Sequence, residues 1–67
     1  MARDTILIVE DDDDSRVKLT EIFQDSYKVQ AVSNEKEGID ILRKHAASIA
    51  VVLVNIMIPA RENFKVM

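Results

Sequence analysis

Five consecutive carboxylates, Glu10 to Asp14, directly follow the apolar run Ile6 to Val9. So many negative charges within one turn repel one another, and a hard cation such as Mg²⁺, held by oxygen ligands and water, would relieve part of that repulsion. Glu10 and Asp11 stand where the apolar run meets the loop, so we predict that these two residues are metal ligands. The last two carboxylates of the run are interpreted as a solvated helix N-terminus.

A calcium-binding loop of the EF-hand type is an alternative use of the same carboxylates. Their spacing matches several ligand positions of such a loop, from Glu10 to Glu21. However, Ser15 occupies the position where the sharp turn needs Gly, and the residues before the loop form a strand-like run where a helix is required. The sequence therefore disfavours this alternative.

Apolar runs predict the strands that position these residues. Ile6 to Val9 and Ile49 to Val54 are continuous and rich in β-branched residues, a pattern typical of strands buried on both faces of a parallel sheet. Tyr27 to Val32 alternates polar and apolar residues, which predicts a short second strand at an edge. The sequence thus predicts three strands, two of them buried.

The first of two amphipathic helices is predicted from about Asp13 to Gln24. Leu19, Ile22 and Phe23 recur at i, i+3 and i+4, so they form an apolar stripe along one side of this helix. Asp12 or Asp13 can cap its N-terminus.

The second helix is predicted from Asn34 to near His45. Asn34 and Glu37 have the spacing of a capping box, and the apolar face comprises Ile39, Ile41 and Leu42. Gly38 inside the helix costs up to about 1 kcal/mol relative to Ala. That cost is tolerable if the helix lies close to the sheet.

The order β-α-β-α-β predicts an α/β fold in one domain, residues 1–67. Right-handed crossovers then give a parallel sheet with helices on both faces. The carboxyl ends of parallel strands share one edge of a sheet, which is where open α/β folds bind their ligands. We therefore expect Asn55, which ends the third strand, to lie at the same edge as the acidic run.

Ile-Leu-Ile-Val-Glu-Asp at 6–11, followed by Arg16, and Val-Leu-Val-Asn-Ile-Met-Ile-Pro at 52–59 resemble the receiver domain of bacterial two-component response regulators. The resemblance covers essentially the whole chain and implies the N-terminal half of a flavodoxin-like doubly wound sheet.

The resemblance implies roles for four residues. Glu10, Asp11, Asn55 and the backbone carbonyl of Met57 would hold Mg²⁺, and Asn55 would stand where the family has its phosphate-accepting aspartate. An amide is uncharged and a poor nucleophile, so we expect no aspartyl phosphate and only weak Mg²⁺ binding. The family's two further strands and three further helices, which carry other phosphoryl-binding residues, have no counterpart in this chain.

Three functions remain open. The first is a receiver-like module that is not an enzyme and acts by contact with a sensor histidine kinase or another signalling protein. The second is a phosphoacceptor receiver domain that carries an Asp-to-Asn replacement. The third is a structural half-domain that assembles by dimerisation.

Composition narrows the choice of partners and compartment. The 67 residues are 48% hydrophobic and 31% charged and contain no cysteine, which indicates a folded segment without disulfides or thiolate metal sites. A net charge of -3 disfavours nucleic acid and anionic membranes. No apolar stretch is long enough for a signal peptide or a membrane span, so we expect a cytoplasmic protein.

The third strand, residues 49–54, is long, apolar and without charge. In the receiver strand order it would be an unprotected edge, and such edges seek another strand. We therefore predict a homodimer in which this strand pairs antiparallel with its copy, giving the strand order 2-1-3-3-1-2.

Overall fold

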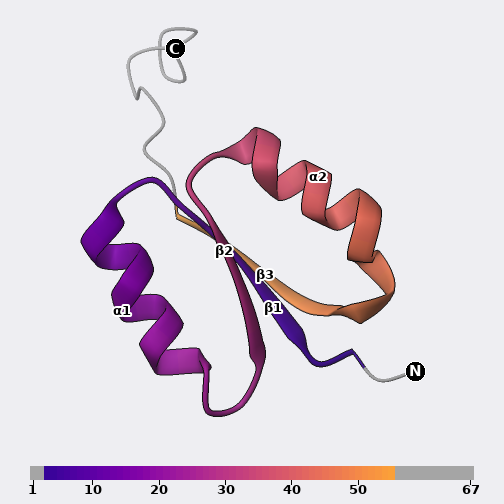
Figure 1. The fold of residues 1–67 in the computed structure, drawn as a ribbon, viewed down its shortest axis with the longest axis horizontal. Helices are drawn as coiled ribbons and strands as arrows, with labels where there is room; N and C mark the ends of the chain where they lie inside the picture. Colours follow the sequence, from indigo (N-terminus) through magenta and orange to yellow (C-terminus); the bar gives the residue numbers. More distant parts are fainter. Residues whose placement is uncertain (1–2, 56–67) are drawn as a thin grey trace, which may run out of the picture.

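The computed structural model describes residues 3–55, which form a three-stranded sheet and two α-helices (Figure 1). In chain order the elements are β1 (Thr5–Glu10), α1 (Asp13–Phe23), β2 (Lys28–Val32), α2 (Glu35–His45), the short 3-10 helix η1 (Ala46–Ser48) and β3 (Ile49–Asn55). The predicted β-α-β-α-β order is confirmed. β2 begins one residue later than predicted, because the Tyr27 N–H still donates to the Phe23 carbonyl at 2.9 Å.

The sheet is parallel, with strand order β2-β1-β3. This is the predicted α/β topology of half a flavodoxin-like sheet, with β1 in the centre. β1 is buried on both faces, as its continuous apolar sequence predicts. The register pairs Glu10 with Asn55, and it is irregular between Thr5 and Ile6.

The two helices cover opposite faces of the sheet, α1 on one side and α2 on the other (Figure 1). The strand order explains this arrangement. The chain steps in one direction from β1 to β2 and in the other from β2 to β3, and crossovers of the same hand then pass over opposite faces. No helix within residues 3–55 is long and apolar enough to cross a membrane.

α1 turns a partly polar side toward the sheet. Asp12, one of the two predicted candidates, is its N-cap and accepts a hydrogen bond from the Ser15 N–H at 2.9 Å. The predicted apolar stripe is correct for Leu19 and Phe23, which are partly buried, but wrong for Ile22, which is 65% exposed. The side of α1 that faces the sheet instead contains Leu19, Phe23 and Arg16. The Arg16 guanidinium donates to the Glu10 carbonyl at the end of β1.

α2 lies close against the sheet because it has Gly38 at the point of contact. A Cβ at this position would stand 2.9 Å from Cγ2 of Val9, closer than such atoms approach. Asn34 caps the helix by accepting from the Glu37 N–H at 2.9 Å, as predicted. The Glu37 side chain accepts from Ser33 instead of completing the reciprocal half of a capping box on Asn34.

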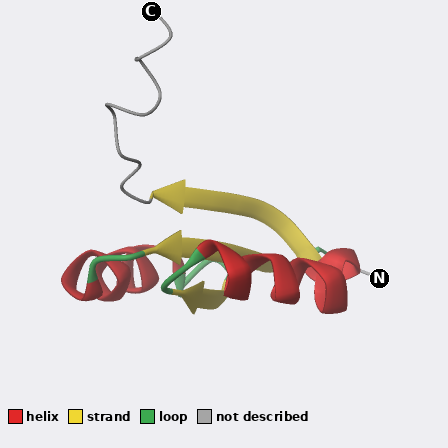
Figure 2. Cartoon of the chain, turned by 90° about the horizontal axis from the view of Figure 1, so that it is seen from above, coloured by secondary structure: helices red, strands yellow, loops and turns green. Residues whose placement is uncertain are grey.

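The core lies around β1, and β3 is largely outside it. Leu7, Val9 and Ile49 form the buried cluster under α2. The prediction that the third strand is buried is wrong for most of its length, because Val52 is 42% and Val54 57% exposed. The physical reason is visible in Figure 2, where β3 lies beyond both helices, which pack on β1 and β2.

Candidate functional site

Glu10 and Asn55 meet at the carboxyl edge of the sheet. The parallel register places them side by side at the ends of β1 and β3, so both side chains leave the same face of the sheet. The Asn55 Nδ2 donates a hydrogen bond to the Glu10 Oε1 at 2.5 Å. The predicted proximity of these two residues, 45 positions apart in sequence, is therefore correct.

Glu10 is a buried carboxylate, only 2% exposed, and both of its oxygens accept hydrogen bonds. Oε1 accepts from Asn55, and Oε2 accepts from the backbone N–H of Asp12 at 3.0 Å. Burying a charged group is costly unless hydrogen bonds replace the lost water. The Asn55 amide and the backbone turn after β1 thus supply what the buried charge requires.

Arg16 is the cation of this site. Its Nη1 donates to the Glu10 backbone carbonyl at 2.9 Å, and its Nη2 forms an ion pair with Asp13 at 2.5 Å. The guanidinium therefore connects the first turn of α1 to the end of β1. Residue types alone do not predict this role for Arg16. The sequence feature that could have indicated it is a basic residue one turn into a helix whose first residues are carboxylates.

Asp12 caps the N-terminus of α1. The Ser15 N–H holds the pKa of Asp12 below its ordinary value of 3.8, with smaller contributions from the Ser15 hydroxyl and from nearby cations. Asp13 and Asp14 are exposed in the first turn of α1, as expected for a solvated helix N-terminus. Asp12 to Asp14 thus have structural roles or face water.

Three of the four predicted metal ligands lie within the described residues. Glu10 and Asn55 are together, Asp11 is exposed in the adjacent loop, and Met57 lies outside the described residues. Within residues 3–55, no three carboxylate, imidazole or thiolate side chains are grouped to hold a metal ion. The predicted ligand set contains only two such side chains, so this finding does not test it.

The carboxyl edge can offer oxygen ligands to a cation, but both oxygens of the Glu10 carboxylate already accept hydrogen bonds from the protein. Glu10 has the carboxylate that a hard cation prefers, and the Asn55 amide has one oxygen. The nitrogen of the Asn55 amide, however, donates a hydrogen bond to Glu10 Oε1, an oxygen that could otherwise bind a cation. A cation bound to this oxygen would have to displace the amide, and the end of β3 offers no carboxylate nucleophile.

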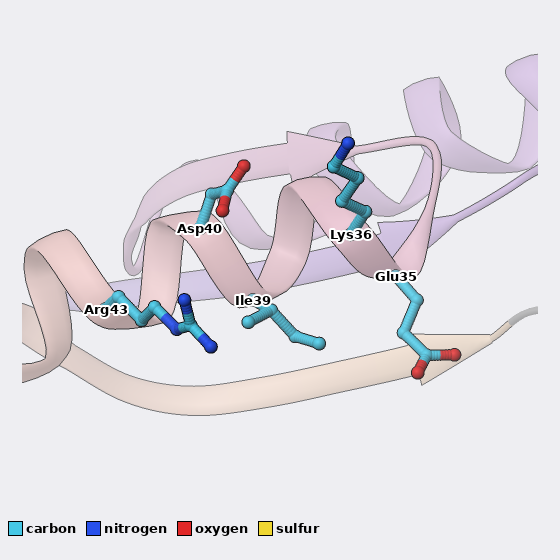
Figure 3. A pocket seen from close by; sticks show the side chains of 5 residues that line it. All are labelled: Glu35, Lys36, Ile39, Asp40 and Arg43. Atoms are coloured by element: carbon cyan, nitrogen blue, oxygen red, sulfur yellow. The ribbon is translucent and has the colours of Figure 1, made fainter.

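Two surface hollows among the described residues lie beside α2. Figure 3 shows one of them, which lies along α2 and is lined by Glu35, Lys36, Ile39, Asp40 and Arg43. A smaller apolar hollow lies between α2 and the sheet, beside β3. Glu10 and Asn55 line neither of these two hollows. Arg16 lines a third hollow, together with Val17, Thr20, Glu21 and Ala31.

No protein-family model, curated protein or solved structure matches this chain. The fold and the local geometry define an α/β unit with a parallel 2-1-3 sheet and a hydrogen-bonded polar pair at its carboxyl edge.

Proposed function

We propose that this chain is a receiver-like module of two-component signalling that carries no phosphoryl group on residue 55 and acts through protein contacts. The proposal combines the sequence resemblance with one observation: the Asn55 amide donates to the buried Glu10 carboxylate. Like the receiver domains that it resembles, the module would work in the cytoplasm with a sensor histidine kinase or another signalling protein.

The amide changes the chemistry of the edge in two ways. An aspartate at position 55 could attack a phosphoryl group, whereas the nitrogen lone pair of an amide is delocalised and its oxygen is a poor nucleophile. An aspartate would also add a second negative charge next to Glu10 and call for a cation between them. The Asn55 N–H supplies a hydrogen bond to Glu10 without any cation.

Magnesium binding is therefore proposed to be weak. The ligands would be the side chains of Glu10, Asp11 and Asn55 and the backbone carbonyl of Met57. Two of these side chains stand together at the carboxyl edge, which fits an oxygen-ligated cation. The competing hydrogen bond and the missing charge at position 55 both lower the affinity.

Incubation with a small phosphodonor and Mg²⁺, followed by intact-mass measurement, tests the proposal. We expect no mass gain in the unchanged chain. A rapid, base-labile gain of one phosphoryl group would contradict the proposal, whichever residue carried it. The Asn55→Asp variant, treated in parallel, tests the alternative function of a phosphoacceptor domain with a replaced aspartate.

A magnesium titration of the same two proteins tests the ligand set. Binding to the unchanged chain should be weaker than binding to Asn55→Asp, because the variant has one more carboxylate at the edge. Equal affinities would show that residue 55 lies outside the metal shell, and the resemblance would then assign the wrong residues.

A further inference from the structure

The free edge of β3 differs in chemistry from the free edge of β2. Among residues 3–55, β3 pairs only with β1, and Ile49–Asn55 contains no charged residue. Val51, Val52 and Val54 are between 41% and 57% exposed. β2, in contrast, begins with Lys28, which pairs with Asp4 at 3.4 Å. Charges protect sheet edges from pairing with other strands, so β3 is the edge suited to association.

The side of α2 next to this edge has an ordered pattern of charge. Figure 3 shows Glu35, Ile39 and Arg43 on the side of α2 that faces β3, whereas Lys36 and Asp40 point the other way. The first three residues are spaced by four, so they form one line along the helix. The line runs from a negative end, through an apolar centre, to a positive end.

This line and β3 form one continuous surface. Ile39 and Glu35 border the apolar hollow that is also lined by Val52 and Val54. Glu35 lies near the end of β3, and Arg43 lies toward its beginning (Figure 3). The surface therefore has an apolar middle and opposite charges at its two ends.

We propose that a second copy of this chain covers this surface. The β3 strands of the two copies pair antiparallel about a two-fold axis normal to the sheet, which extends the sheet to six strands. A rotation about this axis keeps both α2 helices on the same face and makes them antiparallel. Glu35 of each copy then faces Arg43 of the other, with the two Ile39 side chains near the axis.

The charge pattern is what selects a second copy in this orientation. The two-fold axis brings the negative end of one surface to the positive end of the other, twice per dimer. A parallel pairing of the two β3 strands would need a two-fold axis along the strands, which would place the two α2 helices on opposite faces of the sheet and keep these charges apart. The uncharged β3 edge supplies backbone hydrogen bonds and apolar area, and the charges on α2 set the direction and register.

Sedimentation equilibrium of the full chain, with charge-reversed variants, tests the proposal. The unchanged chain should dimerise at micromolar concentration. Glu35→Arg alone, or Arg43→Glu alone, should weaken self-association about tenfold, because two exposed attractive contacts become repulsive. Lys36→Glu and Asp40→Lys, on the neighbouring line of α2 whose side chains point away from β3, are the matched controls and should leave association unchanged.

Mixing the two weakened variants is the sharper measurement. In a heterodimer of Glu35→Arg with Arg43→Glu, both facing pairs again have opposite charges, so the mixture should associate about as tightly as the unchanged chain. The association of the mixture is compared with that of each variant measured alone. A loss of stability in one variant is therefore present in both measurements. Circular dichroism on each sample checks that the variants are folded.

Three outcomes would overturn the proposal. One is a folded monomer at tens of micromolar, since another part of the chain or a different protein would then be the occupant of the β3 edge. Another is association that is unaffected by Val52→Lys, which places a charge on β3. The third is a mixture of the two charge variants that binds no more tightly than each variant alone.

Discussion

Asn55→Asp is the substitution that most directly tests the carboxyl edge. It replaces the amide nitrogen that donates to Glu10 with an oxygen and leaves the size of the side chain unchanged. The buried Glu10 carboxylate would lose one of its donors and face a second carboxylate. We expect the variant to be less stable without a divalent cation and to recover stability when one is added.

The size of the effect follows from two terms. A hydrogen bond to a charged group contributes about 1.5–3 kcal/mol, and the variant loses it. Two like charges about 4 Å apart repel by roughly 4 kcal/mol at an effective dielectric constant near 20, and solvent next to the exposed residue 55 reduces that figure substantially. The expected loss is about 2–4 kcal/mol, most of the roughly 3–5 kcal/mol that a chain of this length obtains from its core.

Urea unfolding followed by circular dichroism measures this loss. The unchanged chain, Asn55→Asp and Asn55→Ala should be compared in a chelator and then in Mg²⁺, at one fixed protein concentration because dimerisation would add to stability. Asn55→Ala removes the donor without adding charge and should lose about 1.5–3 kcal/mol. Magnesium at ten times its dissociation constant should restore about 1.4 kcal/mol to Asn55→Asp.

Two results would refute this reasoning. If Asn55→Asp were as stable as the unchanged chain in the chelator, the Asn55 amide would not be the group that satisfies Glu10. If Mg²⁺ stabilised all three proteins equally, its site would lie away from residue 55.

Three further predictions concern the elements that position the site. Gly38→Ala should destabilise the fold by about 1 kcal/mol despite the better helix propensity of alanine, because its Cβ would overlap the Val9 side chain. Urea unfolding measures this loss. Equal or higher stability would show that α2 can move away from the sheet. Asn34→Ala should cost about 0.5–2 kcal/mol by removing the α2 cap, whereas Asn34→Asp should keep most of it. The folded-state pKa of Asp12 is lowered, so its contribution to stability is present above the ordinary value of 3.8 and is lost as pH falls below it; acid titration of Asp12→Asn, which keeps a capping side chain, should lack this component.

The order and type of the elements could be predicted from sequence because they depend on local patterns. The buried run Ile6 to Val9 identified the central strand, and Asp12 and Asn34 identified the helix starts through their ability to accept backbone hydrogen bonds. The error at Ile22 has a different origin. An apolar stripe alone cannot show that the sheet-facing side of α1 also includes Arg16, which binds the Glu10 carbonyl.

The exposure of β3 could not be predicted from its own residues. A continuous apolar run is typical of a strand buried on both faces, but burial also requires elements that cover those faces. α1 and α2 cover β1 and β2, and the described chain has nothing equivalent over β3 (Figure 2). The residues of β3 are of types suited to burial, but most of them are exposed among the described residues.

The candidate site shows the same division between residue type and geometry. Parallel topology made it possible to predict that Glu10 and Asn55 would lie at the same edge of the sheet. It could not indicate that the amide nitrogen would point at the carboxylate, which depends on the unmet hydrogen-bonding need of a buried charge. With that hydrogen bond in place, the carboxyl edge is held together without a cation. An aspartate at position 55 would lack this donor and add a second negative charge, so we expect the same edge to depend on a cation in that variant.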